Sequence, residues 1–179
     1  MTLDSDIIDG MLKRDEQAFA RCYQLTSSVI YSAIFRICQN KATAQDILQE
    51  TYIQAFNNLD KLKEAEKFMP WLKRIAFNKT ISWIRANDKP MVDIEELTDQ
   101  EGLNSETELA EHIAVKNELT KLLAVLPSQA RLVLWLYAIE GYNHNEISEM
   151  HGKSVSYSKA IVSRAFKLLK TKVEIASNG

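Results

Sequence analysis

Apolar positions recur at helical spacing along almost the whole chain, and no stretch shows sustained alternation of apolar and polar residues. Only five glycines and three prolines interrupt the pattern. A recurrence every three or four residues places apolar side chains on one face of a helix, whereas strands alternate with a period of two. The pattern therefore predicts an all-α fold.

The first half of the chain predicts three long helices. The first runs from about Asp15 to Cys38, with an inward face of Phe19, Tyr23, Val29, Ile30, Ala33, Ile34 and Ile37. Thr43 is a candidate N-cap for the second, because its hydroxyl can accept from the backbone N–H groups that begin a helix. The second helix follows directly, with a stripe of Ile47, Leu48, Tyr52, Ala55, Phe56 and Leu59. Residues 60–67 are expected to form a loop or frayed turn, and the third helix covers residues 68–87.

The second half predicts a short bundle that ends in two helices joined by a glycine turn. Pro127 can begin a helix and Gly141 can end it, and the run "LVLWLYAI" between them is apolar on nearly all sides, as expected of a buried centre. Asn143 and Glu146 have the spacing of a capping box for the next helix. Gly152 supplies a turn, and Ser154 or Ser156 can cap the last helix. Helix, short turn and helix is the outline of a helix-turn-helix.

Charge divides the chain into two mildly basic blocks and an acidic segment. Residues 1–87 hold 12 basic and 10 acidic side chains, residues 88–111 hold one and nine, and residues 127–179 hold seven and four. An acidic segment poor in aromatics is typical of a linker. We therefore expect two small helical domains, 1–87 and 112–179, joined by a flexible acidic linker at 88–111.

The last helix carries a basic face. From Met150 to Val173 there are six Lys or Arg residues and no acid. Small polar and long basic side chains suit a helix that enters the major groove, where bulk is penalised and phosphates attract cations. The alternative is an ordinary solvated face. The candidate DNA-binding residues are Ser156, Tyr157, Lys159, Ala160, Ser163, Arg164 and Lys167.

A second basic stretch, residues 67–85, interleaves five cations with aromatic side chains and contains no acid. Exposed aromatics beside cations can hold unstacked single-stranded bases. The alternative is that aromatics at helical spacing belong mostly to the core, with one or two of them at the surface. The aromatic residues are Phe68, Trp71, Phe77 and Trp83.

Several function classes find no support in the sequence. Cys22 and Cys38 lie too far apart along one helix for a disulfide, and we expect both to be buried apolar groups. The three histidines have no zinc-ligand spacing with them, and there is no Walker A or dinucleotide loop. We therefore expect no metal, no cofactor and no enzymatic activity. No membrane-length apolar run or signal peptide is present, which predicts a cytoplasmic protein without membrane contact of its own.

The two blocks resemble regions two and four of bacterial sigma-70 factors of the extracytoplasmic-function (ECF) group. The resemblance rests on "TAQDILQETYIQAFNNLDKL" and "FMPWLKRIAFNKTISWIR" in the first block and on "LPSQARLVLWLYAIEGYNHNEISEMHGKSVSYSKAIVSRAFKLL" in the second. It implies a transcription initiation subunit that binds core RNA polymerase and directs it to promoter DNA. It also implies an anti-sigma protein as a regulatory partner.

The resemblance assigns residues to three surfaces. Region two would bind the polymerase through Asp46, Gln49, Glu50 and Ile53, and Asp46 and Glu50 are carboxylates one helical turn apart. Its minus-ten surface would capture unpaired bases with Lys67, Trp71, Arg74, Asn78 and Lys79. Region four would read the minus-thirty-five duplex with the last-helix residues named above. Two positions usually basic in the family are Ile161 and Phe166 here, so fewer phosphate contacts are expected.

A stand-alone helix-turn-helix regulator that binds operator DNA is the main alternative. It accounts for residues 127–173 and leaves "QDILQETYIQAF" and "WLKRIAFN" without a role. Binding of core polymerase separates the two hypotheses.

Overall fold

The computed structural model describes residues 3–87 and 114–177, and these residues form helices and turns without a strand. Contacts divide the chain into two compact units, Met1–Ser82 and Trp83–Gly179, which we call the N-terminal and C-terminal units. The all-α class and the two helical units predicted from the sequence are confirmed. The predicted linker at 88–111 lies outside the described residues.

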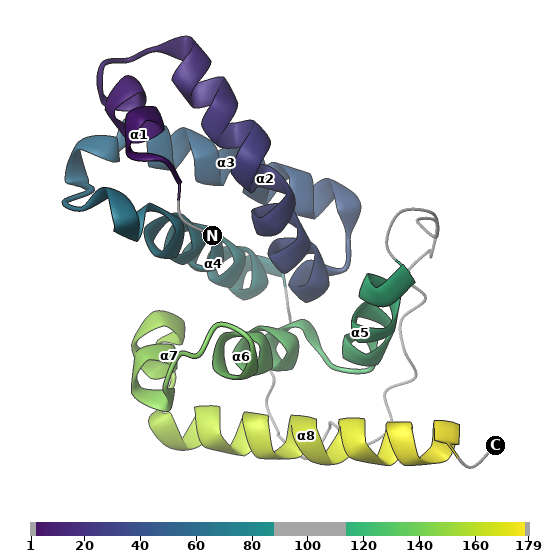
Figure 1. Ribbon diagram of the computed structural model, residues 1–179. Helices are drawn as coiled ribbons and strands as arrows, with labels where there is room; N and C mark the ends of the chain where they lie inside the picture. Colours follow the sequence, from purple (N-terminus) through teal and green to yellow (C-terminus); the bar gives the residue numbers. More distant parts are fainter. Residues whose placement is uncertain (1–2, 88–113, 178–179) are drawn as a thin grey trace. The chain divides into compact units, whose positions relative to one another are not determined.

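The N-terminal unit contains helices α1 to α3 and α4 as far as Ser82 (Figure 1). Helix α2 packs against both α1 and α3, and two 3₁₀ turns lie between α3 and α4. The loop expected at residues 60–67 is formed largely by these turns. The bounds are α1 Ser5–Leu12, α2 Glu16–Cys38, α3 Lys41–Asn57, η1 Leu59–Lys61, η2 Ala65–Lys67 and α4 Phe68–Asn87.

Helix α1 was not predicted, although its signals are local. Asp4 caps it, because the Asp6 N–H donates to Asp4 Oδ1 at 3.2 Å. Ile8 and Met11, three residues apart, are buried on one face. The eight-residue length explains the omission, since so short a helix gives only two turns of pattern.

The predicted cap of α3 was wrong by three residues. Asn40 is the N-cap, and its Oδ1 accepts from the Thr43 N–H at 2.9 Å, so Thr43 lies inside the first turn. Gln39 adopts a left-handed conformation with φ 54° and closes α2. The connection between α2 and α3 is therefore tight, and the asparagine side chain takes the capping role given to threonine.

Two residues assigned to the inward face of α2 are exposed. Tyr23 and Val29 show 43% and 40% of their surface to solvent. The Tyr23 ring contacts the buried Tyr52 with centroids 4.8 Å apart, so it covers the edge of the core. Val29 lies about 100° around the helix from the buried Ile30, which turns it away from the core.

A buried hydroxyl pair joins α2 to α3. Thr26 Oγ1 donates to the Cys22 carbonyl at 2.7 Å and lies 2.6 Å from the Tyr52 hydroxyl. Both side chains are almost completely buried, so their polar atoms need these partners. Burial raises the pKa of the Cys22 thiol to about 11, with Thr26 opposing the shift. Cys22 and Cys38 are both buried thiols, as predicted.

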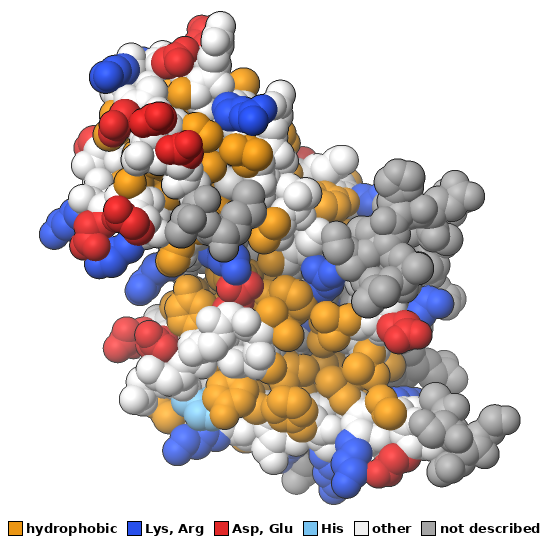
Figure 2. Space-filling view, viewed as in Figure 1, with side chains coloured by type: hydrophobic (Ala, Val, Ile, Leu, Met, Phe, Trp, Pro, Cys, Tyr) orange, Lys and Arg blue, Asp and Glu red, His pale blue; other side chains and the backbone are white. Residues whose placement is uncertain are grey.

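The C-terminal unit contains α5 to α8, with α6 against both α7 and α8. Buried residues Leu132 to Leu136 form the centre expected from the apolar run. Apolar side chains gather between α5, α6 and α8 on the face seen in Figure 2. The bounds are α5 Ala114–Ala124, α6 Ser128–Ala138, α7 His144–His151 and α8 Val155–Ser177.

The helix-turn-helix outline is formed as predicted. Asn143 and Glu146 make a complete capping box at the start of α7. Gly152 ends α7 at φ 66°, a left-handed conformation that side chains with a Cβ adopt at a cost. Ser154 caps α8, since its Oγ accepts from the Tyr157 N–H at 3.1 Å. Each cap predicted for α7 and the turn is therefore confirmed, and Ser154 rather than Ser156 caps the last helix.

No helix in the described part of the chain has the length and apolar character needed to span a bilayer.

Candidate protein and nucleic-acid interfaces

The four residues predicted for polymerase binding share one exposed face of α3. Asp46, Gln49, Glu50 and Ile53 are all exposed, at a spacing of three and four residues. The opposite face of α3 is buried against the unit and includes Ile47 and Leu48. Ile53 exposes 54% of its surface, which is unusual for so large an apolar side chain. We call these four residues the α3 surface; it combines carboxylates with an exposed apolar side chain, as protein interfaces often do.

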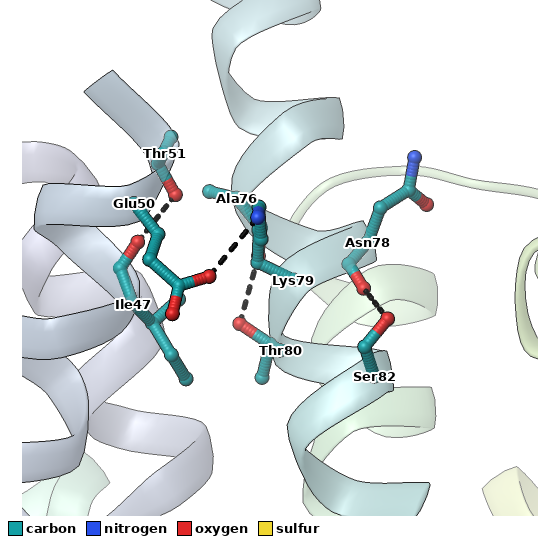
Figure 3. Close-up of polar contacts among 8 residues, drawn as sticks. All are labelled: Ile47, Glu50, Thr51, Ala76, Asn78, Lys79, Thr80 and Ser82. Carbon is teal, nitrogen blue, oxygen red and sulfur yellow. Dashed lines mark hydrogen bonds and ion pairs between the residues drawn. The ribbon is translucent and has the colours of Figure 1, made fainter. Parts of the chain in front are cut away.

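Three of the five residues predicted for minus-ten DNA share an exposed or half-exposed face of α4. Trp71, Arg74 and Asn78 follow one another at i, i+3 and i+7, and the Asn78 amide is exposed. Figure 3 shows the Asn78 side chain directed away from Glu50 and Lys79. We call these three residues the α4 surface. A half-exposed indole beside a guanidinium and an amide can stack on a base, contact a phosphate and hydrogen-bond to a base edge.

The four aromatic residues of this stretch divide between core and surface, as expected if most of them belong to the core and one or two reach the surface. Phe68 and Phe77 are completely buried and belong to the core. Trp71 and Trp83 are half-buried. The Phe68 and Trp71 rings lie 6.0 Å apart, so the buried phenylalanine supports the indole from inside the unit.

The other two predicted minus-ten residues are engaged by carboxylates. Lys79 Nζ lies 3.0 Å from Glu50 Oε2, which joins α4 to the α3 surface (Figure 3). Lys67 Nζ lies 2.7 Å from Oε1 of Glu64, the residue that precedes the η2 turn. The structure thus brings Lys79 to the predicted polymerase-binding residues. Sequence reasoning missed this pair, because 29 residues separate its members and no local pattern relates them.

The buried hydroxyls beside this ion pair bond within their own helices. Thr51 Oγ1 donates to the Ile47 carbonyl at 2.6 Å, and Thr80 Oγ1 donates to the Ala76 carbonyl at 2.9 Å (Figure 3). Neither threonine shows any surface to solvent. Their hydroxyls are satisfied without a partner across the helices, so the Glu50–Lys79 pair is not needed to compensate a buried polar group there.

The basic face of α8 has an exposed line of four residues. Ser156, Ser163, Lys159 and Lys167 are exposed, while Ala160 is half-buried and lies among them. Their spacing places them opposite the buried positions Ile161, Ala165 and Leu169. We call these five residues the α8 surface. Its small side chains allow close approach of a groove, and its two lysines can reach phosphates.

Two other predicted residues of α8 have structural partners or sit at its edge. The Tyr157 hydroxyl donates to Gln129 Oε1 at 2.9 Å, which ties α8 to the start of α6. Arg164 is half-buried, and its Nη1 is buried without a hydrogen-bond partner among the described residues. Both lie away from the centre of the α8 surface, so they are less available than the five residues named above.

The start of α7 is joined to α8 and α6 by contacts of His144 that the sequence did not reveal. His144 Nδ1 and the buried Ser158 Oγ are 3.0 Å apart, and the His144 ring stacks on Tyr137 at 4.6 Å between centroids. His151 is buried with neither ring nitrogen hydrogen-bonded among the described residues, and burial lowers its pKa. Ile161, a position usually basic in the resembled family, is completely buried, so it supports the unit and contributes no charge.

Family comparisons match both units. Residues 22–89 match the family described as Sigma-70 region 2, and residues 116–169 match the family described as Sigma-70, region 4. The RNA polymerase sigma factor YlaC of Bacillus subtilis (strain 168) is 30% identical over 141 residues, which cover 76% of this chain and 80% of that protein. The chain belongs to the sigma-70 family of RNA polymerase sigma factors.

Further relatives place this sigma factor in the ECF group. The ECF RNA polymerase sigma factor SigM of Bacillus subtilis is 28% identical over 148 residues, covering 83% of this chain and 90% of that protein. The structure is similar in fold to the sigma factor RpoE of Bartonella quintana, solved in complex with the anti-sigma factor NepR. The TM-score is 0.56 at 18% identity, covering 88% of this chain and 97% of that one.

Proposed function

We propose that this sigma factor binds core RNA polymerase and directs it to specific promoters, where it helps to melt the minus-ten region. The α3 surface would contact the polymerase, the α4 surface together with Lys67 and Lys79 would hold unpaired minus-ten bases, and the α8 surface with Tyr157 and Arg164 would read the minus-thirty-five duplex. The domains would be residues 1–87 and 112–179, joined by the acidic linker at 88–111. Membership of the sigma-70 family supports the overall assignment.

The observation that carries the assignment of the α3 surface is the exposure of Ile53 one turn beyond the Gln49 amide and the Glu50 carboxylate. An apolar side chain with 54% exposure on a regular helix has no role in the unit's own core. Apolar anchors surrounded by polar residues dominate the binding energy of protein interfaces. The adjoining carboxylates, Asp46 and Glu50, would complement a basic polymerase surface and orient the encounter.

Run-off transcription tests the proposed function. Purified core polymerase with and without this protein should be supplied with a pool of promoter fragments. Start sites that appear only with the protein would support a sigma factor, and their alignment would give both promoter elements. Duplex binding without polymerase binding or transcripts would instead favour a stand-alone helix-turn-helix regulator.

Ile53→Glu tests the α3 surface directly. We expect polymerase affinity to fall at least about tenfold, because a charge replaces the exposed apolar anchor of the proposed interface. Val29→Glu is the matched control, since Val29 is an exposed β-branched residue on α2 with 40% exposure. Equal losses in the two variants would show that the α3 surface has no special role.

Further elements of the proposal concern regulation and location. The similarity in fold to a sigma factor solved with an anti-sigma factor supports an anti-sigma protein as a partner. Such a partner should block run-off transcription in a purified system, and excess core polymerase should relieve the block. The protein would act in the cytoplasm with the polymerase, as a binding subunit without cofactor or catalytic site of its own.

A further inference from the structure

The ion pair between Glu50 and Lys79 links two surfaces with different proposed partners. Glu50 belongs to the α3 surface, and Lys79 is a predicted minus-ten residue on α4. We propose that this pair is a latch that makes single-stranded DNA binding depend on polymerase binding. The inference rests on the proposed function of the two surfaces and adds a coupling between them.

The position of Lys79 on α4 explains why it can be held back. Asn78 lies on the α4 surface, and the next residue is about 100° further around the helix. Lys79 therefore leaves that surface and extends toward α3, where its Nζ donates to Glu50 Oε2 at 3.0 Å (Figure 3). The Lys79 side chain is 30% exposed. In the protein alone, the cation is thus directed at a carboxylate and away from the Asn78 amide.

Glu50 is the accessible member of the pair. Its side chain is 60% exposed, so a cation of the polymerase can approach the carboxylate from solvent. A polymerase cation at Glu50 weakens the attraction that holds Lys79, because the carboxylate then shares its charge between two cations. The flexible four-carbon stem of Lys79 is then able to swing toward the phosphates of a strand on the α4 surface.

Linkage determines the direction and symmetry of the effect. If polymerase binding at Glu50 strengthens DNA binding through Lys79 by some factor, DNA binding strengthens polymerase binding by the same factor. Exposed ion pairs have small interaction energies, which correspond to about a two- to fivefold effect. The latch is therefore a modest bias toward forming the complete complex.

The Lys67–Glu64 pair provides an internal control. It also couples a predicted DNA-binding lysine to a carboxylate, at 2.7 Å, with side chains 65% and 54% exposed. Both members lie in or beside η2, and neither belongs to the α3 surface. Glu64→Gln changes the net charge by the same amount as Glu50→Gln without touching the proposed latch.

The test is a double-mutant cycle on the full chain without polymerase. The probe is a fluorescein-labelled pool of random-sequence single-stranded DNA, about 20 nucleotides long, read by anisotropy at several salt concentrations. We expect Glu50→Gln to strengthen binding about two- to fivefold and to steepen the salt dependence by about 0.7, the value for one added phosphate contact. Lys79→Met alone should weaken binding by less than Glu50→Gln strengthens it, because Glu50 holds most of the Lys79 population in the unmutated protein, and it should abolish the gain from Glu50→Gln. Glu64→Gln should have the same effect whether or not Lys79→Met is present.

Polymerase binding supplies the second arm. Lys79→Met should strengthen binding of core polymerase about two- to fivefold, because Glu50 no longer has an internal partner, and Glu50→Gln should remove that gain. Thermal unfolding of each variant checks that the fold is unchanged. If Glu50→Gln strengthens DNA binding by the same factor with Lys79 intact and in the Lys79→Met variant, the gain comes only from the change in net charge. That result would overturn the latch.

Failure of the latch and failure of the proposed function give different results. Normal run-off transcription with additive mutant effects would overturn the latch alone. An unmutated protein that neither binds core polymerase nor starts transcripts would overturn the proposed function, and with it the coupling to polymerase.

Discussion

The basic stretches of the two units present their cations in different ways. In the N-terminal unit, Lys67 and Lys79 both lie within ion-pair distance of a glutamate. In the C-terminal unit, Lys159 and Lys167 are exposed on α8 and hold no ion pair with any described residue. The two predicted lysines are therefore paired with carboxylates in the N-terminal unit, and the two in the C-terminal unit are not paired with any described residue. Local charge counts along the sequence do not reveal this difference, because the pairing depends on contacts.

The α4 surface and the α8 surface also differ in the kinds of side chain they present. The α4 surface has a half-exposed indole resting on the buried Phe68, which suits stacking on unpaired bases. The α8 surface has small side chains and lysines, which suit close approach to a duplex groove. We propose that the units recognise different forms of DNA, and their contacts divide them into separate clusters. The following experiments test both statements.

Removing a core side chain from one unit at a time should give the greatest change in the free energy of unfolding. Leu136→Ala removes a completely buried side chain from α6 and should lower the free energy of unfolding by about 2–5 kcal/mol. Because the units are separate clusters of contacts, amide hydrogen exchange should rise in α6 to α8 and stay unchanged in α1 to α3. Ile34→Ala in α2 should show the reverse. Equal acceleration throughout the chain in either variant would mean that the units unfold together.

A second test concerns the open cations of α8. Lys159→Ala and Lys167→Ala should each weaken binding to duplex promoter DNA and reduce its salt dependence by about 1, through loss of one phosphate contact. Lys172→Ala is the control, because Lys172 is exposed on the same helix but turned away from the α8 surface. Fluorescence anisotropy across a salt series measures all three variants. A loss for Lys172→Ala as large as the others would mean that only total charge matters.

The hydroxyl pair in the N-terminal unit predicts a smaller change in stability. Tyr52→Phe removes the hydroxyl that lies 2.6 Å from Thr26 Oγ1 while keeping the ring. The free energy of unfolding should fall by about 0.5–1.5 kcal/mol, the usual net value of a hydrogen bond. Urea unfolding followed by circular dichroism gives the value. Tyr23→Phe, at an exposed ring on the same edge, should change it by less, and a reversed order would contradict the buried contact.

Acid should weaken the C-terminal unit before the N-terminal one. Burial lowers the pKa of His151, so the folded unit favours the neutral ring, whereas the unfolded chain takes up the proton near pH 6.5. Stability from this group is therefore present above about pH 6.5 and declines as the pH falls below it. Residues 1–87 contain no histidine, so α1 to α3 should not share this response. Hydrogen exchange at about pH 7.5 and about pH 5.5, on either side of that value, compares the units, and His151→Phe should remove the decline.

The smallest expected effect is the rate of chemical labelling of Cys22, which should be very slow. The thiol is completely buried and its pKa is raised to about 11, so almost no thiolate is present near neutral pH. Iodoacetamide should modify it only when the N-terminal unit opens, which makes the rate a probe of that unit alone. Leu136→Ala should leave the rate unchanged. Rapid labelling of the unmutated protein would contradict the burial of Cys22.

Local signals predicted much of the helical framework. The start and end of α4 matched the expected range of 68–87, and the capping box at Asn143 and Glu146 formed as its spacing required. Such features depend on neighbours within a few residues, and the sequence records those neighbours directly. The predictions for Tyr23 and Val29, at the margins of the inward face of α2, were wrong. Burial at a margin depends on how far the neighbouring helices extend over it.

The candidate sites were predicted as positions and not as contacts. The spacing of Asp46, Gln49, Glu50 and Ile53 was enough to place them on one face, and that face is exposed. The spacing did not show that Lys79 would turn to Glu50 or that the Tyr157 hydroxyl would bond to Gln129. The partners lie 29 and 28 residues apart, where the packing of helices decides which side chains meet.

The order of residues was sufficient to establish that this protein is helical, that it has two blocks, and which family it belongs to, because apolar periodicity, caps and motif order are properties of short segments. The folded arrangement of the helices decided which lysines pair with a carboxylate and which do not. Pairing a lysine with a glutamate on another helix requires that both helices be placed to within a few ångströms, and only the packed core of the unit determines that distance.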